Sequence, residues 1–402
     1  MSTRFDILIL VCVVLLAIMG LLAIYSTTVQ NPADASQNNF YRQVIWIGIG
    51  LVAGIIAALI PLKFLSSISY TFYIITLLGL VVLIFAGRGS GTHRWLNIGA
   101  IQIQPSEFAK IGIVLALAKY LYSDRTDLTR FSVVLTCFAI IGLPMILILR
   151  QPDMGTALVF AGMILPMLYW AGLPKFTLFL IVAPIITCIS AFNYYTFFIV
   201  IISITVILYI SHRGKRVLVI NFMLNVAVGI FSPLVWNRLA PYQQKRILTF
   251  VGLESDPQGI GYQVIQSKVA IGSGGLLGKG FMEGTQTQLR FLPEQHTDFI
   301  FSVIGEEFGF FGALLILVLF LIILIRGVQI AASVRNKYTS LVVIGAVIIL
   351  ALHVIINVGV TVGIMPVTGL PLPFVSYGGS SFITFSLLIG LILNGSIRKL
   401  EY

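Results

Sequence analysis

The run ILILVCVVLLAIMGLLAIYST, residues 7–27, sets the class of this protein because it is apolar and uncharged throughout. An α-helix of about 20 apolar residues crosses the roughly 30 Å hydrocarbon layer of a membrane. Few charges precede the run and no small-residue cleavage site follows it. We therefore expect a retained membrane span rather than a signal peptide.

Runs of the same kind recur along the whole sequence. Hydrophobic residues make up 58% of the 402 residues and charged residues only 10%, which is typical of a polytopic membrane protein. Because backbone polar groups in lipid must be satisfied internally, these runs are predicted to be helices. We expect an all-α membrane protein, with residues 1–402 as a single transmembrane domain. Candidate spans are centred near residues 17, 52, 76, 113, 140, 163, 185, 202, 226, 312, 350 and 387.

The charged loops predict the orientation of the bundle. The loops of one side carry Lys119, Arg125, Arg130, His212, Arg213, Lys215, Arg216, Arg326, Arg335, Lys337, Arg398 and Lys399. An excess of basic residues marks the cytoplasmic side, so both termini are expected in the cytoplasm. The net charge of +11 is then mainly a topology signal, and we expect no nucleic-acid partner. The opposite, extracytoplasmic face receives residues 88–104, 150–153, 237–297 and 365–379.

Residues 237–297 form the longest polar interruption and are predicted to be a large extracytoplasmic loop that carries part of a site. The outward face is basic, against the usual topology rule. Its basic residues are Arg88, Arg94, Arg150, Arg238, Lys245, Arg246, Lys268, Lys279 and Arg290. Either lipid head groups attract these residues, or they hold an anionic ligand such as a phosphate or pyrophosphate.

Residues 270–280, AIGSGGLLGKG, invite comparison with a nucleotide-binding loop. A Walker loop ending at Lys279 would need glycine at Ser273 and Ser or Thr at Gly280, so that comparison fails. Backbone amides around Ser273 and Gly274 can still bind a phosphate. The local sequence supports equally well a flexible, close-packed loop that binds no ligand.

Polar residues also flank the fourth span. Glu107 and Lys110 are three apart after Pro105, so on a helix they share a face and can neutralise each other. Ionisable residues so close to hydrocarbon usually face a cavity or a partner, and a purely structural ion pair is the alternative. Trp95, beside Arg94, is either an interfacial belt residue or a stacking face for a sugar ring.

Acidic residues mark two helix starts on the outer face. Asp153 is either an N-cap or a ligand contact. Asp298 ends the segment Leu292-Pro293-Glu294-Gln295-His296-Thr297-Asp298, with Glu306 and Glu307 further along. A partly desolvated carboxyl has a raised pKa that suits a general base, whereas a helix N-terminus favours the anion. We predict Asp298 as the catalytic base, with an N-cap role as the alternative. The proline-broken stretch 363–380 is expected to wall the same site.

Taken together, these motifs resemble the SEDS family (shape, elongation, division and sporulation proteins). The resemblance rests on Arg94-Trp95, residues 104–110 (QPSEFAK), 151–156 (QPDMGT), Gly261-Tyr262-Gln263, 272–280, 292–301 (LPEQHTDFIF) and 371–379 (PLPFVSYGG). Residues 284–286 (GTQ), which lead into Leu292-Pro293-Glu294, are more similar to the rod-shape branch than to the division branch.

The resemblance implies a peptidoglycan glycosyltransferase in the bacterial cytoplasmic membrane that polymerises lipid II on the outer face. It implies a class B penicillin-binding protein, other elongation proteins and membrane lipid as partners. It also implies Asp298 as the essential aspartate. The expected substrate contacts are Arg94, Trp95, Glu107, Lys110, Asp153, Tyr262, Gln263, Lys268, Ser273, Gly274, Lys279 and His296. No cofactor is expected, and a divalent cation stays an open alternative.

Family members usually have ten spans, whereas residues 176–236 are long enough for two extra, so we expect a SEDS-type bundle of ten to twelve helices. The expected reaction inverts the donor sugar, as in inverting glycosidases with a sugar hydroxyl in place of water. The alternatives are a lipid II flippase, a division-specific relative, and a scaffold without catalytic activity. A flippase would carry polar residues near the midplane of several spans, whereas this chain concentrates them at one face.

Overall fold

The computed structural model describes residues 5–28, 37–86, 94–98, 101–123, 126–211, 214–239, 243–244, 248, 260–289 and 291–399. Several residues used in the topology prediction lie outside these ranges, namely Arg88, Arg125, His212, Arg213, Lys245, Arg246 and Arg290. Much of the first half of the predicted 237–297 loop lies outside them as well.

The described chain is mostly helical, which confirms the all-α membrane class. The long helices are α1 (Ile7–Thr28), α2 (Gln37–Leu59), α3 (Leu62–Ala86), α4 (Pro105–Tyr122), α5 (Phe131–Leu149), α6 (Met154–Trp170), α7 (Lys175–Ser190), α8 (Tyr194–Ile210), α9 (Gly214–Trp236), α14 (Gly309–Ser333), α15 (Lys337–Thr361) and α16 (Gly379–Ile397). Each predicted span centre lies within one of them. The shorter elements are α11 (Ile260–Gly274), α12 (Thr285–Gln288), α13 (Ile300–Glu307), β1 (Leu96–Ile98) and β2 (Ile101–Ile103).

Among the described residues, eight helices are long and apolar enough to cross a membrane. Helices α6, α7 and α8 are apolar but shorter, with 16 or 17 residues each. Helix α4 is a continuous helix that is not among the eight, since it carries three charged residues, Glu107, Lys110 and Lys119. Strands β1 and β2 pair antiparallel as a short hairpin immediately before α4.

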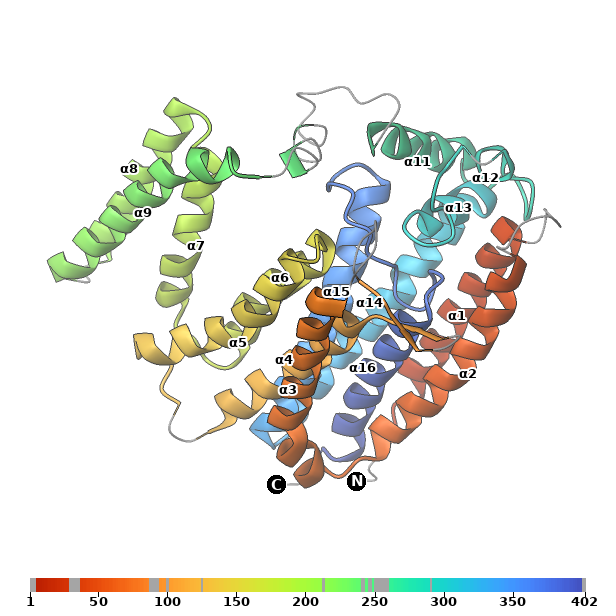
Figure 1. Cartoon of the computed structure of the whole chain (residues 1–402), viewed down its shortest axis with the longest axis horizontal. Coiled ribbons are helices and arrows are strands. Elements are labelled where there is room, and N and C mark those ends of the chain that lie inside the picture. The colour runs from red at the N-terminus through yellow and green to blue at the C-terminus, as the bar shows by residue number, and fades with distance from the viewer. Residues whose placement is uncertain are drawn as a thin grey trace. The chain divides into compact units, whose positions relative to one another are not determined.

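The chain divides into two compact units, residues 1–171 with 255–402, and residues 172–254. In the first unit α15 is the central helix, because 78% of its most apolar window is buried against 22% for α2 and for α3. It packs against α4, α6, α14 and α16. Figure 1 shows α1, α2, α14, α15 and α16 side by side in this unit.

One ion pair and one hydrogen bond join the two ends of the chain to α14 and the segment that follows it. Asp6, just before α1, accepts from the guanidinium of Arg326 on α14 at 2.7 Å. The Arg335 amide donates to the Lys399 carbonyl at 3.3 Å. The beginning of α1, the end of α14 and the end of α16 therefore meet at one end of the bundle, as the loop charges predict.

Helices α2 and α16 pack extensively against each other. A Cβ added at Gly390 would lie 2.3 Å from the Gly54 carbonyl oxygen, so only glycine fits there. At the end of α2, the Asn394 side-chain amide donates to the carbonyls of Ala57, Ala58 and Ile60 at 2.7–3.1 Å. A small residue and a polar side chain thus set the register of the two helices, as is common between membrane helices.

The second unit holds α7, α8 and α9, in the part of the sequence with room for two extra spans. A buried polar pair joins α7 to α9, where Thr187 Oγ1 donates to Asn225 Oδ1 at 2.7 Å. The Asn225 amide group donates in turn to Asn221 at 2.8 Å. Interhelical hydrogen bonds of this kind hold helices together in lipid, where apolar contact alone gives little preference.

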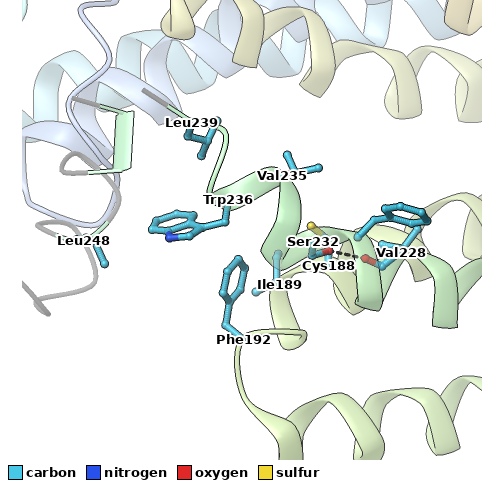
Figure 2. A pocket seen from close by; sticks show the side chains of 10 residues that line it. Cys188, Ile189, Phe192, Val228, Ser232, Val235, Trp236, Leu239 and Leu248 are labelled. Atoms are coloured by element: carbon cyan, nitrogen blue, oxygen red, sulfur yellow. Dashed lines mark hydrogen bonds between the residues drawn. The ribbon is translucent and has the colours of Figure 1, made fainter. Parts of the chain in front are cut away.

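An apolar pocket of about 770 Å³ opens at the ends of α7 and α9 (Figure 2). It is lined by Cys188, Ile189, Phe192, Val228, Phe231, Ser232, Val235, Trp236, Leu239 and Leu248. The Phe192 and Trp236 rings meet edge to face at 5.5 Å. The Ser232 hydroxyl donates to the Val228 carbonyl at 2.7 Å, so it offers little to a polar ligand.

Replacing Gly390 by valine should separate α2 from α16 and lower the free energy of unfolding by about 2 kcal/mol or more, as overpacked cores do. Melting in detergent, followed by circular dichroism, measures this. Gly48→Ala on α2 is the matched control, because a Cβ there meets nothing within 4 Å. A Gly390→Val protein that melts with the wild type would contradict the proposed close approach.

Candidate active site

Asp298 lies where the long polar segment enters α13. The N-cap of α13 is Phe299, so Asp298 precedes the cap instead of forming it. Its carboxyl is half-buried and faces the turn at Gly369, where an added Cβ would lie 3.5 Å from Oδ2. The carboxylate is therefore placed beside the proline-broken stretch.

The backbone around Asp298 is clamped by α15 and by residues 370–377. The buried Asn357 side chain donates to the carbonyls of Asp298 at 3.0 Å and Leu370 at 2.8 Å. Ser376 Oγ donates to the Thr297 carbonyl at 2.5 Å, and the Tyr377 amide donates to the His296 carbonyl at 2.9 Å. The structure thus brings stretch 363–380 against residues 296–298, as predicted.

His296 is half-buried beside the ring of Tyr377, with the ring centroids 5.7 Å apart. Burial lowers the pKa of His296, and the charge of Glu294 opposes this shift. The imidazole is therefore neutral at physiological pH, so it can donate or accept one hydrogen bond near Asp298 without adding positive charge.

Glu107 and Lys110 form the predicted ion pair, with Nζ to Oε1 at 2.7 Å and both side chains fully or almost fully buried. Lys110 Nζ also lies 2.9 Å from His353 Nε2 and 5.5 Å from the centre of the Phe385 ring. His353 Nδ1 is 3.2 Å from the Pro371 carbonyl oxygen. If Nδ1 carries the proton and donates to that carbonyl, Nε2 accepts from the ammonium.

This geometry matches the alternative of a structural ion pair, since the ammonium is enclosed by protein groups. A contact between Lys110 and a ligand stays a prediction. His353 and Asn357 were not among the predicted site residues; they lie one helical turn apart in the apolar run of α15. Two polar residues at that spacing were the available signal.

Arg94 and Asp153 organise the turn between α5 and α6. The Arg94 guanidinium donates to the carbonyls of Gln151, at 3.4 Å, and Pro152. Asp153 is the N-cap of α6, which was one of the two predicted roles. Its carboxylate accepts from Thr156 N at 3.2 Å and from Thr156 Oγ1 at 2.9 Å. Trp95 is 45% exposed, which is compatible with either predicted role.

The glycine-rich segment is a close-packed turn. Helix α11 continues to Gly274, and a Cβ there would lie 2.0 Å from the Gly305 carbonyl oxygen. The amides of Lys279 and Gly280 donate to the carbonyls of Glu306 and Glu307 at 3.0 and 3.1 Å. The turn therefore caps the end of α13, which is the packed-loop alternative. The exposed Ser273 donates to its own helix at Ala270.

The two glutamates at the end of α13 have separate structural roles. Glu306 accepts from Lys279 Nζ at 2.7 Å, from the amides of Gln286 and Thr287, and from Thr287 Oγ1. Burial alone would raise the pKa of Glu306, but these hydrogen bonds outweigh it and hold the pKa below its usual value. Glu307 accepts from Ser26 Oγ on α1, and burial raises its pKa to about 7.

Helix α11 carries the remaining predicted contacts. Ser267 anchors it to α13 and α15, at 2.5 Å from Ser302 Oγ and 2.7 Å from the Thr361 carbonyl. Lys268 is exposed, and its aliphatic stem lies near Gly363, where an added Cβ would be 3.4 Å from its Cδ. Tyr262 and Gln263 are half-buried in the first turn. Lys268 thus projects beside the start of stretch 363–380.

A family profile, curated relatives and a solved structure are all similar to this chain. The profile of the cell cycle protein family FtsW, RodA and SpoVE matches residues 6–198 and 177–400. The two matches overlap within α7 and α8, where the extra helices were predicted. The peptidoglycan glycosyltransferase MrdB of Escherichia coli K12 is 34% identical over 384 residues, which cover 94% of this chain and 91% of MrdB.

The peptidoglycan glycosyltransferase RodA of Treponema pallidum is 33% identical over an alignment of 428 positions, gaps included, which covers 98% of each protein. A solved chain described under "Structural coordination of polymerization and crosslinking by a peptidoglycan synthase complex" is 29% identical. It superposes with a TM-score of 0.74 over 99% of both chains.

Glu306→Gln and Glu307→Gln should have opposite effects on stability. Folding raises the pKa of Glu307 from 4.5 to about 7, so wild-type stability falls as the pH rises through this interval. Glu307→Gln removes the ionising group. The change that it makes in the free energy of unfolding should be more favourable at pH 8 than at pH 4.5, by about 1–3 kcal/mol. Melting temperatures in detergent at the two pH values measure this.

Glu306 supplies the control because its pKa is lowered. Its contribution is present above its unfolded pKa and is lost only as the pH falls through the folded value. Glu306→Gln should therefore destabilise the protein at pH 8, where it leaves Lys279 without its ionic partner. Equal melting of both variants at pH 8 would contradict these assignments.

Proposed function

We propose that this chain, which belongs to the FtsW, RodA and SpoVE family of cell cycle proteins, is a peptidoglycan glycosyltransferase that polymerises lipid II. The position of Asp298 carries the proposal. Its carboxyl is half-buried beside Gly369, and its backbone is fixed by Asn357. A carboxylate held at the edge of the bundle in this way suits proton abstraction from a substrate hydroxyl.

In the proposed reaction, Asp298 takes the proton of the acceptor 4-hydroxyl as its oxygen attacks the anomeric carbon of the donor. The new glycosidic bond forms on the face opposite the departing pyrophosphate, so an α-linked donor becomes a β-linked glycan. The exposed Lys268 is available to offset charge on the leaving pyrophosphate, where cationic groups help most. Arg94 and Lys279 shape the surrounding loops through their protein partners.

The proposed orientation places both termini in the cytoplasm and the site outside. The support is a pair of contacts: the Asp6–Arg326 ion pair joins the beginning of α1 to α14, and the hydrogen bond from the Arg335 amide to the Lys399 carbonyl joins the segment after α14 to the end of α16. Basic loop residues concentrate at the cytoplasmic face of membrane proteins. Asp298 then lies towards the extracytoplasmic end, where an undecaprenyl-linked sugar is accessible.

The proposed role is cell elongation with a class B penicillin-binding protein as transpeptidase. Polymerisation alone yields linear strands, so crosslinking needs a second active site. The solved chain from a peptidoglycan synthase complex that coordinates polymerisation and crosslinking supports this pairing. Other elongation proteins and membrane lipid complete the proposed set of partners.

A lipid II flippase is the second candidate function. The buried cluster of Glu107, Lys110 and His353 favours it, because transporters place ionisable groups within the bundle. In this structure the cluster is internally paired, which favours a structural role. Transport of labelled lipid II into sealed vesicles by an Asp298→Asn protein, at the wild-type rate, would support the flippase.

Asp298→Asn should lower polymerisation of purified lipid II by at least about 100-fold, as expected when a general base is removed. Gel analysis of labelled glycan strands, with and without the penicillin-binding partner, measures the rate. Glu294→Gln is the matched control, since Glu294 is an exposed carboxylate four residues earlier in the same segment. Full activity of Asp298→Asn would refute the assignment of the base.

The need for a divalent cation can be tested separately. If protein cations alone offset the charge of the leaving pyrophosphate, polymerisation in EDTA should stay within about twofold of the rate with added Mg²⁺ or Mn²⁺. Loss of activity in EDTA, with recovery on adding one of these ions, would assign a cation to the reaction.

A further inference from the structure

A groove of about 360 Å³ lies between the ends of α1 and α2 and the turn that follows Gly280. One stripe of α1 forms its floor, with Ile18, Leu21, Leu22 and Tyr25 at helical spacings of three, four and seven. The remaining lining residues are Phe40 of α2 and Phe281 of the turn. All six side chains are apolar or aromatic.

Aromatic contacts give this groove a defined shape. The Tyr25 and Phe40 rings meet edge to face at 5.3 Å. The Tyr25 and Phe281 rings are nearly parallel at 6.3 Å, and Phe281 lies 6.2 Å from Phe308 at the end of α13. Rings from three separate segments of the chain therefore hold each other in place.

The buried Glu307 joins the two walls of the groove. Its carboxyl accepts a hydrogen bond from Ser26, the residue after Tyr25, and its backbone carbonyl accepts from the amide of Gly280, the residue before Phe281, at 3.1 Å. Its side chain is only 1% exposed. The spacing between the α1 wall and the Phe281 wall is thus set by a polar bridge behind the groove.

The lining suits a hydrocarbon chain. Water in a cavity needs two to four polar partners, and these six side chains offer only the Tyr25 hydroxyl. Ile18, Leu22 and Phe281 are 48%, 38% and 40% exposed, so the groove opens at the surface of the bundle. A hydrocarbon chain can therefore enter it directly from the bilayer.

Helix α13 lies between the groove and the candidate active site and links the two. The turn that carries Phe281 is bonded to the last carbonyls of α13, and the helix begins two residues after Asp298. A helix of eight residues is about 12 Å long. The two ends of one short helix thus carry the candidate base and a wall of the groove.

We propose that this groove binds the methyl-branched hydrocarbon chain of the polyprenyl-linked sugar substrate and so positions its pyrophosphate near Asp298. The inference rests on the proposed function for the identity of the substrate. Filling the groove should weaken the binding of long-chain substrates and spare the chemical step.

The test uses Leu22→Trp in the full-length protein, with Leu15→Trp as the matched control. Leu15 is two turns earlier on the same face of α1, is 42% exposed and does not line the groove. Polymerisation is measured with natural-length lipid II and with an analogue that carries only two or three isoprene units. We expect Leu22→Trp to raise KM for the long-chain substrate about tenfold, because several buried methylene groups lose their contacts. The maximal rate and KM for the short-chain analogue should not change.

A direct binding measurement separates this proposal from the proposed function. A polyprenyl phosphate with a photoreactive group in its chain should label residues 18–25 or 281, and unlabelled polyprenyl phosphate should compete. If the wild-type protein is labelled but does not polymerise lipid II, the groove assignment stands and the proposed polymerase function is wrong. Polymerisation with an equal KM change for both chain lengths, or competition by phosphatidylglycerol alone, would overturn the groove assignment.

Discussion

A lysine ammonium that is removed from water needs oppositely charged or polar partners, because an unpaired charge in a membrane bundle is too costly to bury. Lys110 meets this constraint where α4, α15 and α16 come together, through Glu107, His353 and the ring of Phe385. His353 in turn lies against the Pro371 carbonyl. The chain of polar contacts from Lys110 thus reaches stretch 363–380, and one turn further along α15 the Asn357 side chain donates to the Asp298 carbonyl.

Much of this architecture can be predicted from sequence, because it depends on local patterns. Apolar runs of membrane length predicted every long helix, and the i,i+3 spacing predicted the bond between Glu107 and Lys110. Asp153 was predicted as a possible N-cap from its place before an apolar run. Each of these inferences uses only residues within a single continuous segment of the chain.

The parts that escaped prediction depend on contacts between distant segments. His353 is more than 240 residues from Lys110, and no spacing rule connects them. Glu306 and Glu307 were grouped with Asp298 because the three are close in sequence, but the glutamates bind the 279–287 turn and α1. For the glycine-rich segment, the sequence allowed two interpretations, phosphate binding and close packing. Its packing depends on the carbonyls of α13, which a local pattern does not include.

The clamp on Asp298 has a genetic consequence. Asn357, Ser376 and Tyr377 donate to the backbone carbonyls of residues 296–298. Substitution of the Asp298 carboxyl therefore leaves these bonds in place, and the altered protein should fold, insert and accumulate normally. If Asp298 is the proposed base, such a product would compete with the wild-type chain in the same cell for the proposed partner and substrate without extending a strand. Alleles at this position should accordingly be dominant, whereas alleles that break the clamp should be recessive because their products are lost to proteolysis.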